Sequence, residues 1–290
     1  MSAKQESRIK VACLQMEPRI GMVQANVARS LDLIAQAANA GVQLAVLPEL
    51  CNTGYVFESR DEAMALSEEV PQGPTCVAWM EAARKHAMFI VAGVTEREGD
   101  KLYNSAVLVG PDGYIGRYRK NHLWGDENRI FAPGNLGVPV FDIGAGRIAC
   151  AICYDIWFPE IFRLAALQGA DMLCVATNWV PMPEQPGHVP MMANILAMGG
   201  AHSNSMFVAA ADRVGVERGQ AFLGNSLIVS HTGWALAGPA SLDKEEMLIA
   251  DLDLADARRN RHLTDFNERL RDRRTDLYGE MLGAKAQPGY

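Results

Sequence analysis

A cysteine stands between an apolar run and a helix start signal. Residues 147–153 are apolar apart from their first residue and end at Cys153, and Pro159-Glu160 follow, which suits the first turn of a helix. Ligands of α/β proteins bind at the carboxyl ends of strands. A thiol there can face a pocket, and nearby backbone N–H groups favour its thiolate form. Cys153 is therefore a candidate nucleophile, although a small core residue is the common role of such a cysteine.

Two further residues stand at comparable strand ends. Glu49 follows the predicted buried strand at residues 43–47, where burial would raise the pKa of its carboxyl toward neutrality and suit it to act as a general base. Capping of the turn at residues 52–54 is the alternative. Lys120 ends a strand-like segment, and Glu127 lies in the loop that follows. Taken alone, these last two residues are typical of solvated surface positions.

The elements that must position these residues alternate in type. The first third shows a β-α-β-α-β rhythm, which favours an α/β fold, and the segments GPDG and HTG indicate two hairpins. We expect one domain over residues 1–283 and a loose tail at residues 284–290. Strands are predicted at residues 10–16, 43–47, 88–94, 101–109, 114–120, 147–153, 172–176, 206–211, 225–231, 234–237 and 247–254, and helices at residues 26–40, 75–87, 159–167 and 190–202.

The composition excludes several classes of function. A net charge of -7 argues against a nucleic-acid partner, and no apolar run is long enough for a membrane span. The first ten residues lack the apolar stretch of a signal peptide. Most of the 6 cysteines lie in apolar runs, so we expect a reducing compartment, the cytoplasm. Cys150 and Cys153 have CxxC spacing but would face opposite sides of a strand, so no metal site is expected.

Three segments, in this order, resemble the nitrilase superfamily of carbon–nitrogen hydrolases. They are LPELCNTGY around Glu49, YRKNH around Lys120 and CYDIWFPEIFR around Cys153; GNSLIVSHTGWALA and RRTDLY extend the resemblance over nearly the whole chain. It implies a four-layer α-β-β-α sandwich that usually dimerises. It also implies Cys153 as nucleophile, Glu49 as general base, Lys120 as transition-state stabiliser and Glu127 as a second glutamate that orients Lys120 and the substrate. No metal or cofactor is implied.

The residues after the nucleophile bear on the branch of the superfamily. Nitrilases typically have Cys-Trp-Glu, whereas this chain has Cys153-Tyr154-Asp155, which resembles the amidases and carbamoylases. Ile156 and Trp157 stand where carbamoyl-amino-acid hydrolases often place arginines. We expect an amidase that hydrolyses a small apolar or aromatic amide to an acid and ammonia through a cysteine thioester. The alternatives are an N-carbamoyl amine or amino-acid amidohydrolase, a nitrilase, and a silent scaffold of the same fold.

Two further expectations concern the pocket and the assembly. The candidate substrate-binding residues are aromatic, with core packing as their alternative role: Tyr55, Trp124, Tyr154, Trp157 and Trp179. The helix at residues 159–167 is apolar over most of its girth, so a second subunit is expected to cover it. This predicts a homodimer or a higher homo-oligomer. Alternatively, residues 254–282 fold back over the same helix.

Overall fold

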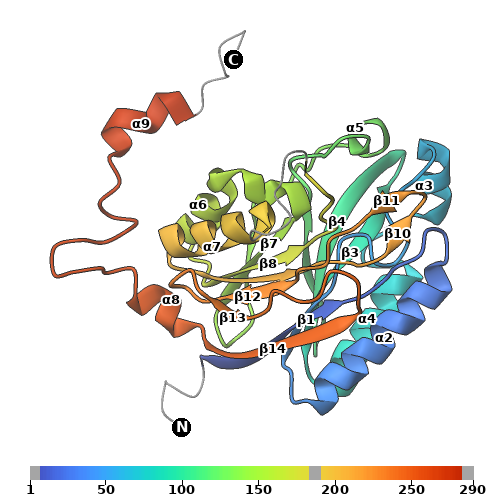
Figure 1. The fold of residues 1–290 in the computed structure, drawn as a ribbon, viewed down its shortest axis with the longest axis horizontal. Helices are drawn as coiled ribbons and strands as arrows, with labels where there is room; N and C mark the ends of the chain where they lie inside the picture. Colours follow the sequence, from blue (N-terminus) through green and yellow to red (C-terminus); the bar gives the residue numbers. More distant parts are fainter. Residues whose placement is uncertain (1–6, 183–190, 283–290) are drawn as a thin grey trace.

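The computed structural model describes residues 7–182 and 191–282, and these form two six-stranded sheets (Figure 1). In spatial order, the first sheet contains β14 (Glu246–Asp253), β1 (Arg8–Gln15), β2 (Leu44–Val46), β3 (Phe89–Glu98), β4 (Lys101–Gly110) and β5 (Gly113–Arg119). The second contains β13 (Ala235–Ala237), β12 (Leu227–Val229), β9 (Phe207–Ala211), β8 (Met172–Ala176), β7 (Arg147–Ile152) and β6 (Val140–Asp142). In each sheet three parallel strands lie at the centre and antiparallel strands flank them.

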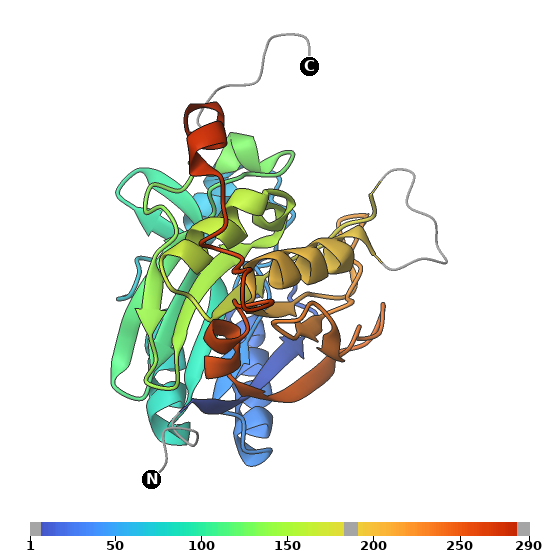
Figure 2. The same ribbon diagram turned by 90° about the vertical axis from the view of Figure 1, so that its left-hand side faces the viewer.

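The two sheets pack face to face, and a pair of helices covers the outer face of each. Helices α2 (Val23–Asn39) and α4 (Pro74–His86) share a core with Ala12 and Leu14 of β1. The alternate residues Val11 and Cys13 share a core with the second sheet and with α6 (Pro159–Leu167) and α7 (Met192–Asn204). This alternation is the period of two of a strand. The predicted four-layer α-β-β-α sandwich is therefore confirmed (Figures 1 and 2).

The central strands of the second sheet are buried on both faces. Every residue of β8 and β9 is buried, as are five of the six residues of β7. Their sequences are accordingly continuous apolar runs rather than alternating ones. β2 contacts β8 and β9 across the two sheets, and the segments that follow β2 and β8 meet at one seam between the sheets, where the Asn178 side chain bonds the Glu49 backbone.

Several boundaries differ from the prediction. The helix predicted at residues 26–40 runs from Val23 to Asn39. Its start was missed because no side chain caps it, so the sequence carries no start signal there. The helix predicted at residues 190–202 is α7, which ends two residues later, where Ser205 turns into the left-handed region; residue 190 lies outside the described residues. Among the short elements that were not predicted are α3 (Arg60–Leu66), α5 (Glu127–Ile130), β6, β10 (Val216–Glu217) and β11 (Gln220–Ala221).

The C-terminal segment leads away from the sandwich. After α8 (Ala255–Arg259) an extended stretch connects to α9 (Thr275–Leu282), which stands apart from the sheets in Figure 1. The predicted tail at residues 284–290 lies outside the described residues, and the single-domain assignment stays a prediction. No helix within the described residues combines the length and the apolar character needed to cross a membrane.

Candidate active site

Cys153 occupies a strained position at the end of β7. It is the first residue of a 3₁₀ helix (Cys153–Trp157), and its φ of 47° lies in the left-handed region, which residues other than glycine rarely adopt. The Asp155 carboxylate closes this turn by accepting the Ile152 N–H, with 3.0 Å between N and Oδ2. Such strain gathers at functional sites. The turn places the thiol at the seam between the sheets, with only 7% of the residue exposed.

Glu49 reaches the same seam from the first sheet. Its Oε1 accepts hydrogen bonds from Lys120 Nζ at 2.7 Å and from Asn104 Nδ2 at 2.6 Å, while Oε2 has no hydrogen-bond partner among residues 7–182 and 191–282. The residue is fully buried. Gly93 permits this approach, because a Cβ at that position would lie 2.5 Å from the Glu49 Cα. The Asn178 side chain donates to the Glu49 carbonyl oxygen at 3.0 Å and links the base to the second sheet.

Lys120 lies between two carboxylates. Its ammonium donates to Glu49 Oε1 and to Glu127 Oε1, each at 2.7 Å, and its side chain is fully buried. Glu127 is also buried, at the start of α5, although its loop position alone had suggested a surface residue. Its two oxygens accept further hydrogen bonds from the Tyr55 hydroxyl at 2.6 Å and from the Trp124 N–H at 3.2 Å.

Burial governs the protonation states in this cluster. It raises the pKa of Glu49 to about 7, against the lowering effect of Lys120 and with a further raising effect of Glu127. Although burial lowers the pKa of Lys120, Glu127 and Glu49 together hold it above its ordinary value. Burial and the neighbouring Glu49 raise the pKa of Cys153 well above its ordinary value. This shift favours the thiol form of Cys153, beside a buried carboxylate of suitable basicity.

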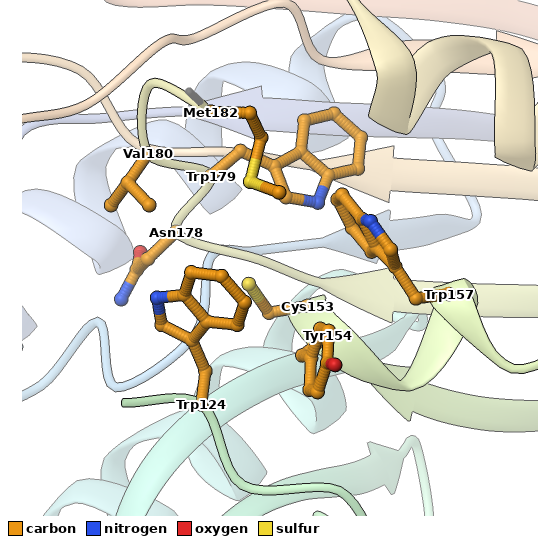
Figure 3. A pocket seen from close by; sticks show the side chains of 8 residues that line it. All are labelled: Trp124, Cys153, Tyr154, Trp157, Asn178, Trp179, Val180 and Met182. Atoms are coloured by element: carbon orange, nitrogen blue, oxygen red, sulfur yellow. The ribbon is translucent and has the colours of Figure 1, made fainter. Parts of the chain in front are cut away.

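An aromatic cavity of about 270 Å³ opens onto the thiol (Figure 3). Four of the five predicted pocket residues line it: Trp124, Tyr154, Trp157 and Trp179. Asn178, Val180 and Met182 complete its wall, so the described lining carries no charged side chain. Tyr55 instead lines a second cavity of about 680 Å³, which shares Trp124 and Val180 with the first.

Other residues of the site were not assigned to it from the sequence. Asp155 had served only to choose a branch, yet its buried carboxylate accepts hydrogen bonds from the Tyr118 hydroxyl at 2.7 Å and the His122 N–H at 3.0 Å. It thereby ties the segment after Lys120 to the nucleophile turn. Asp212 accepts the Trp179 N–H at 2.9 Å and so fixes one wall of the aromatic cavity. No local sequence pattern around Asp155 or Asp212 predicts these contacts.

The site contains no arrangement suited to a metal ion. Across residues 7–182 and 191–282, no group of three or more His, Cys, Asp or Glu side chains is placed to hold one. What the geometry offers is a thiol, a carboxylate that can take its proton, and an ammonium close to both.

Known proteins resemble this chain in sequence and in fold. The family model described as carbon-nitrogen hydrolase matches residues 10–262. The chain is 43% identical to a nitrilase from Pyrococcus abyssi, over 93% of this chain and 99% of that protein. It is 33% identical to an (R)-stereoselective amidase from a Pseudomonas species, over 94% of each. A mutant amidase from Nesterenkonia sp. AN1, with the acetamide moiety of fluoroacetamide added covalently at its active-site cysteine, has a TM-score of 0.77 at 26% identity, covering 95% of this chain and 97% of that chain.

Proposed function

We propose that this chain, which belongs to the carbon-nitrogen hydrolase family and is a hydrolase acting on carbon–nitrogen bonds, is an amidase that converts a small apolar or aromatic amide to a carboxylic acid and ammonia. One observation carries the proposal: a thiol that opens onto an uncharged aromatic cavity lies against a buried Glu49–Lys120–Glu127 cluster. The covalent adduct at the active-site cysteine of the Nesterenkonia amidase supports the same role for Cys153.

The first half of the reaction forms a thioester. Glu49 takes the proton from the Cys153 Sγ, and the sulfur attacks the amide carbon. The tetrahedral oxyanion is held by the Lys120 ammonium and by the backbone N–H of Tyr154. Glu49 then gives its proton to the amide nitrogen, the C–N bond breaks and ammonia leaves. Glu127 holds Lys120 from its other side, so the ammonium stays charged and in place during this step.

The second half hydrolyses the thioester. Glu49, now ionised again, takes a proton from water, and the resulting hydroxide attacks the thioester carbon. The C–S bond breaks, the acid is released and the sulfur recovers its proton from Glu49. One amide and one water thus give one acid and one ammonia, and the enzyme returns to its starting state.

Ammonia release from a panel of substrates tests the proposal. The panel contains aliphatic and aromatic amides, N-carbamoyl amines and nitriles, with carbon dioxide measured in parallel because only the carbamoyl compounds release it. We expect the highest kcat/KM for uncharged amides, and no turnover by Cys153→Ala. Cys150→Ala is the matched control, because it removes a buried thiol of the preceding strand β7 that does not line the cavity. Turnover of amides by Cys153→Ala would contradict the proposed mechanism. A preference for carbamoyl compounds would contradict the proposed substrate class.

We also propose that the enzyme is a homodimer. Leu164 and Leu167 on the outer face of α6 are 47% and 46% exposed and line a cavity of about 1340 Å³ between α6 and α9, so residues 255–282 of the same chain leave this face uncovered. Light scattering at micromolar concentration is expected to give twice the mass of the 31.6 kDa chain. The double substitution Leu164→Glu and Leu167→Glu should lower that mass, and a fully active monomer would contradict the proposal.

The thiols bear on the compartment. All six cysteines lie within the described residues and are free and buried. Free thiols persist in reducing compartments, which supports the proposal that the enzyme works in the cytoplasm. Cell fractionation that finds the active enzyme outside the cytoplasm would contradict it.

A further inference from the structure

A buried ion pair outside the proposed catalytic cluster holds one short segment of backbone. Glu217 on β10 and Arg213, which precedes β10, are 5% and 1% exposed. Glu217 Oε1 accepts from Arg213 Nη1 at 3.0 Å, and Glu217 Oε2 accepts from the backbone N–H groups of Tyr55 and Val56, each at 2.7 Å. One carboxylate thus neutralises a buried guanidinium and fixes two consecutive peptide groups.

The surroundings of this pair leave it little freedom. The Arg213 guanidinium lies over the Phe222 ring, 4.0 Å from its centroid, and that ring packs edge-on against the Tyr55 ring at 5.9 Å. Gly54 has a φ of 86°, and a Cβ there would lie 2.7 Å from Glu217 Oε1. Only a glycine accommodates both the conformation and the close carboxylate. The contact is therefore built into the backbone of the segment as well as into its side chains.

Tyr55 connects this pair to the proposed catalytic cluster. Its backbone is held by Glu217, and its hydroxyl donates to Glu127 Oε1 at 2.6 Å. The same Glu127 oxygen accepts from Lys120 Nζ at 2.7 Å. A displacement of the Tyr55 backbone would therefore move the hydroxyl that fixes the carboxylate beside the ammonium.

We propose that Glu217 is a positioning residue, which acts through Tyr55 to hold the Glu127 carboxylate against Lys120. This inference rests on the proposed function, because it assigns Lys120 to the oxyanion. Glu217 lines neither of the cavities beside the cluster and has no contact with Cys153 among the described interactions. The proposal therefore assigns its effect on turnover to the tyrosine hydroxyl, and this makes the proposal testable by coupling.

A double-mutant cycle tests it. Glu217→Gln keeps the shape of the side chain but replaces one of the two accepting oxygens, and Tyr55→Phe removes only the hydroxyl. We expect each single substitution to lower kcat/KM for the best amide roughly tenfold, since small displacements of catalytic groups have effects of this order or larger. In the Tyr55→Phe background, Glu217→Gln should change kcat/KM by less than about twofold. Two independent, multiplying effects would overturn the proposal.

A control and a second readout separate this test from simple loss of structure. Glu62→Gln removes an exposed ion pair with Arg218 of the same hairpin and should leave kcat/KM within about twofold. If Glu217→Gln does not fold, Glu217→Asp retains the charge toward Arg213 but withdraws it from the Tyr55 N–H, and the cycle is repeated with it.

Alkylation of Cys153 by iodoacetamide gives the second readout and needs no substrate. Lys120 lowers the pKa of this thiol, so looser positioning of the ammonium should slow alkylation about threefold, and only where the Tyr55 hydroxyl is present. If wild-type enzyme releases no ammonia from any compound, the proposed function fails, while the alkylation cycle still decides the role of Glu217. Equal alkylation rates in the wild type, the two single variants and the double variant would overturn the proposed role of Glu217.

Discussion

Two consecutive residues, Arg119 and Lys120, are both buried cations beside two carboxylates, yet their environments differ. They project to opposite sides of the sheet because side chains alternate along a strand. The Arg119 guanidinium donates to both oxygens of Glu98, to Glu96 and to Asn135, and it lies 3.7 Å from the centroid of the Tyr103 ring. Each of its three nitrogens is hydrogen-bonded, so this cluster is saturated.

The cluster around Lys120 is not saturated. Within the part of the chain that the structure describes, Glu49 Oε2 has no hydrogen-bond partner, and burial raises the pKa of Glu49 to about 7. By contrast, the hydrogen bonds from Arg119 hold the pKa of the half-exposed Glu98 below its ordinary value. A carboxylate fully paired with a guanidinium is a poor base, whereas a buried one with an unpaired oxygen has a proton affinity suited to a thiol. Under the proposed function, the Arg119 side serves stability and the Lys120 side serves chemistry.

The largest difference between the two sides is expected for Lys120→Met. This substitution keeps the length of the side chain and removes the ammonium that would meet the oxyanion. We expect kcat/KM to fall roughly 10²–10³-fold, equivalent to about 3–4 kcal/mol of transition-state stabilisation. Amide hydrolysis is measured on protein whose circular dichroism matches the wild type. Near-normal turnover would mean that another group holds the oxyanion.

Arg119→Met should act on stability instead. Glu96 is fully buried and would lose its main partner, so we expect the free energy of unfolding to fall by about 3 kcal/mol. Arg117 Nη1 remains 3.2 Å from Glu96 Oε1 and limits the loss. Urea denaturation measures this change, with Glu98→Gln, at the exposed end of the cluster, expected to cost less than about 1 kcal/mol. If folded Arg119→Met lost turnover as Lys120→Met does, the two cations would not have separate roles.

The sequence distinguishes these two cations only in part. Strand periodicity places them on opposite faces, but the assignment of Lys120 to the site came from the family resemblance of YRKNH, because composition treats both as charged residues at a strand end. The same resemblance led to the four-layer fold, which the structure and the comparisons confirm. Local propensity was sufficient to predict the long strands and helices, because their apolar periodicity is strong.

What could not be predicted depends on contacts between distant segments. The Tyr55 hydroxyl bonds a carboxylate 72 residues away, and its backbone N–H bonds one 162 residues away. No local pattern reports such pairs, so Tyr55 was assigned to the pocket by its aromatic character alone. The missed helix α3 is different, since Ser59 accepts the Glu62 N–H at 3.1 Å and the sequence Ser-x-x-Glu is a recognisable capping signal.

The smallest expected effect, and the one that tests the comparison most directly, is the pH dependence of kcat/KM. Because burial raises the pKa of Glu49 to about 7, its carboxyl keeps a proton that an exposed glutamate would have lost. The base form therefore becomes scarce as the pH falls below 7, and kcat/KM should drop about tenfold per pH unit there and level off above.

Two variants test whether Glu49 is the group that titrates. Asn104→Ala removes a hydrogen bond that favours the ionised form of Glu49, so it should move the acid limb of the pH profile to higher pH. Arg119→Met, on the opposite face, should leave the limb in place. A profile that is flat between about pH 5.5 and 8 would show that no group of this pKa takes the thiol proton. An acid limb that moves in Arg119→Met would show that the cluster around Arg119 influences the pKa of Glu49 in the cluster around Lys120.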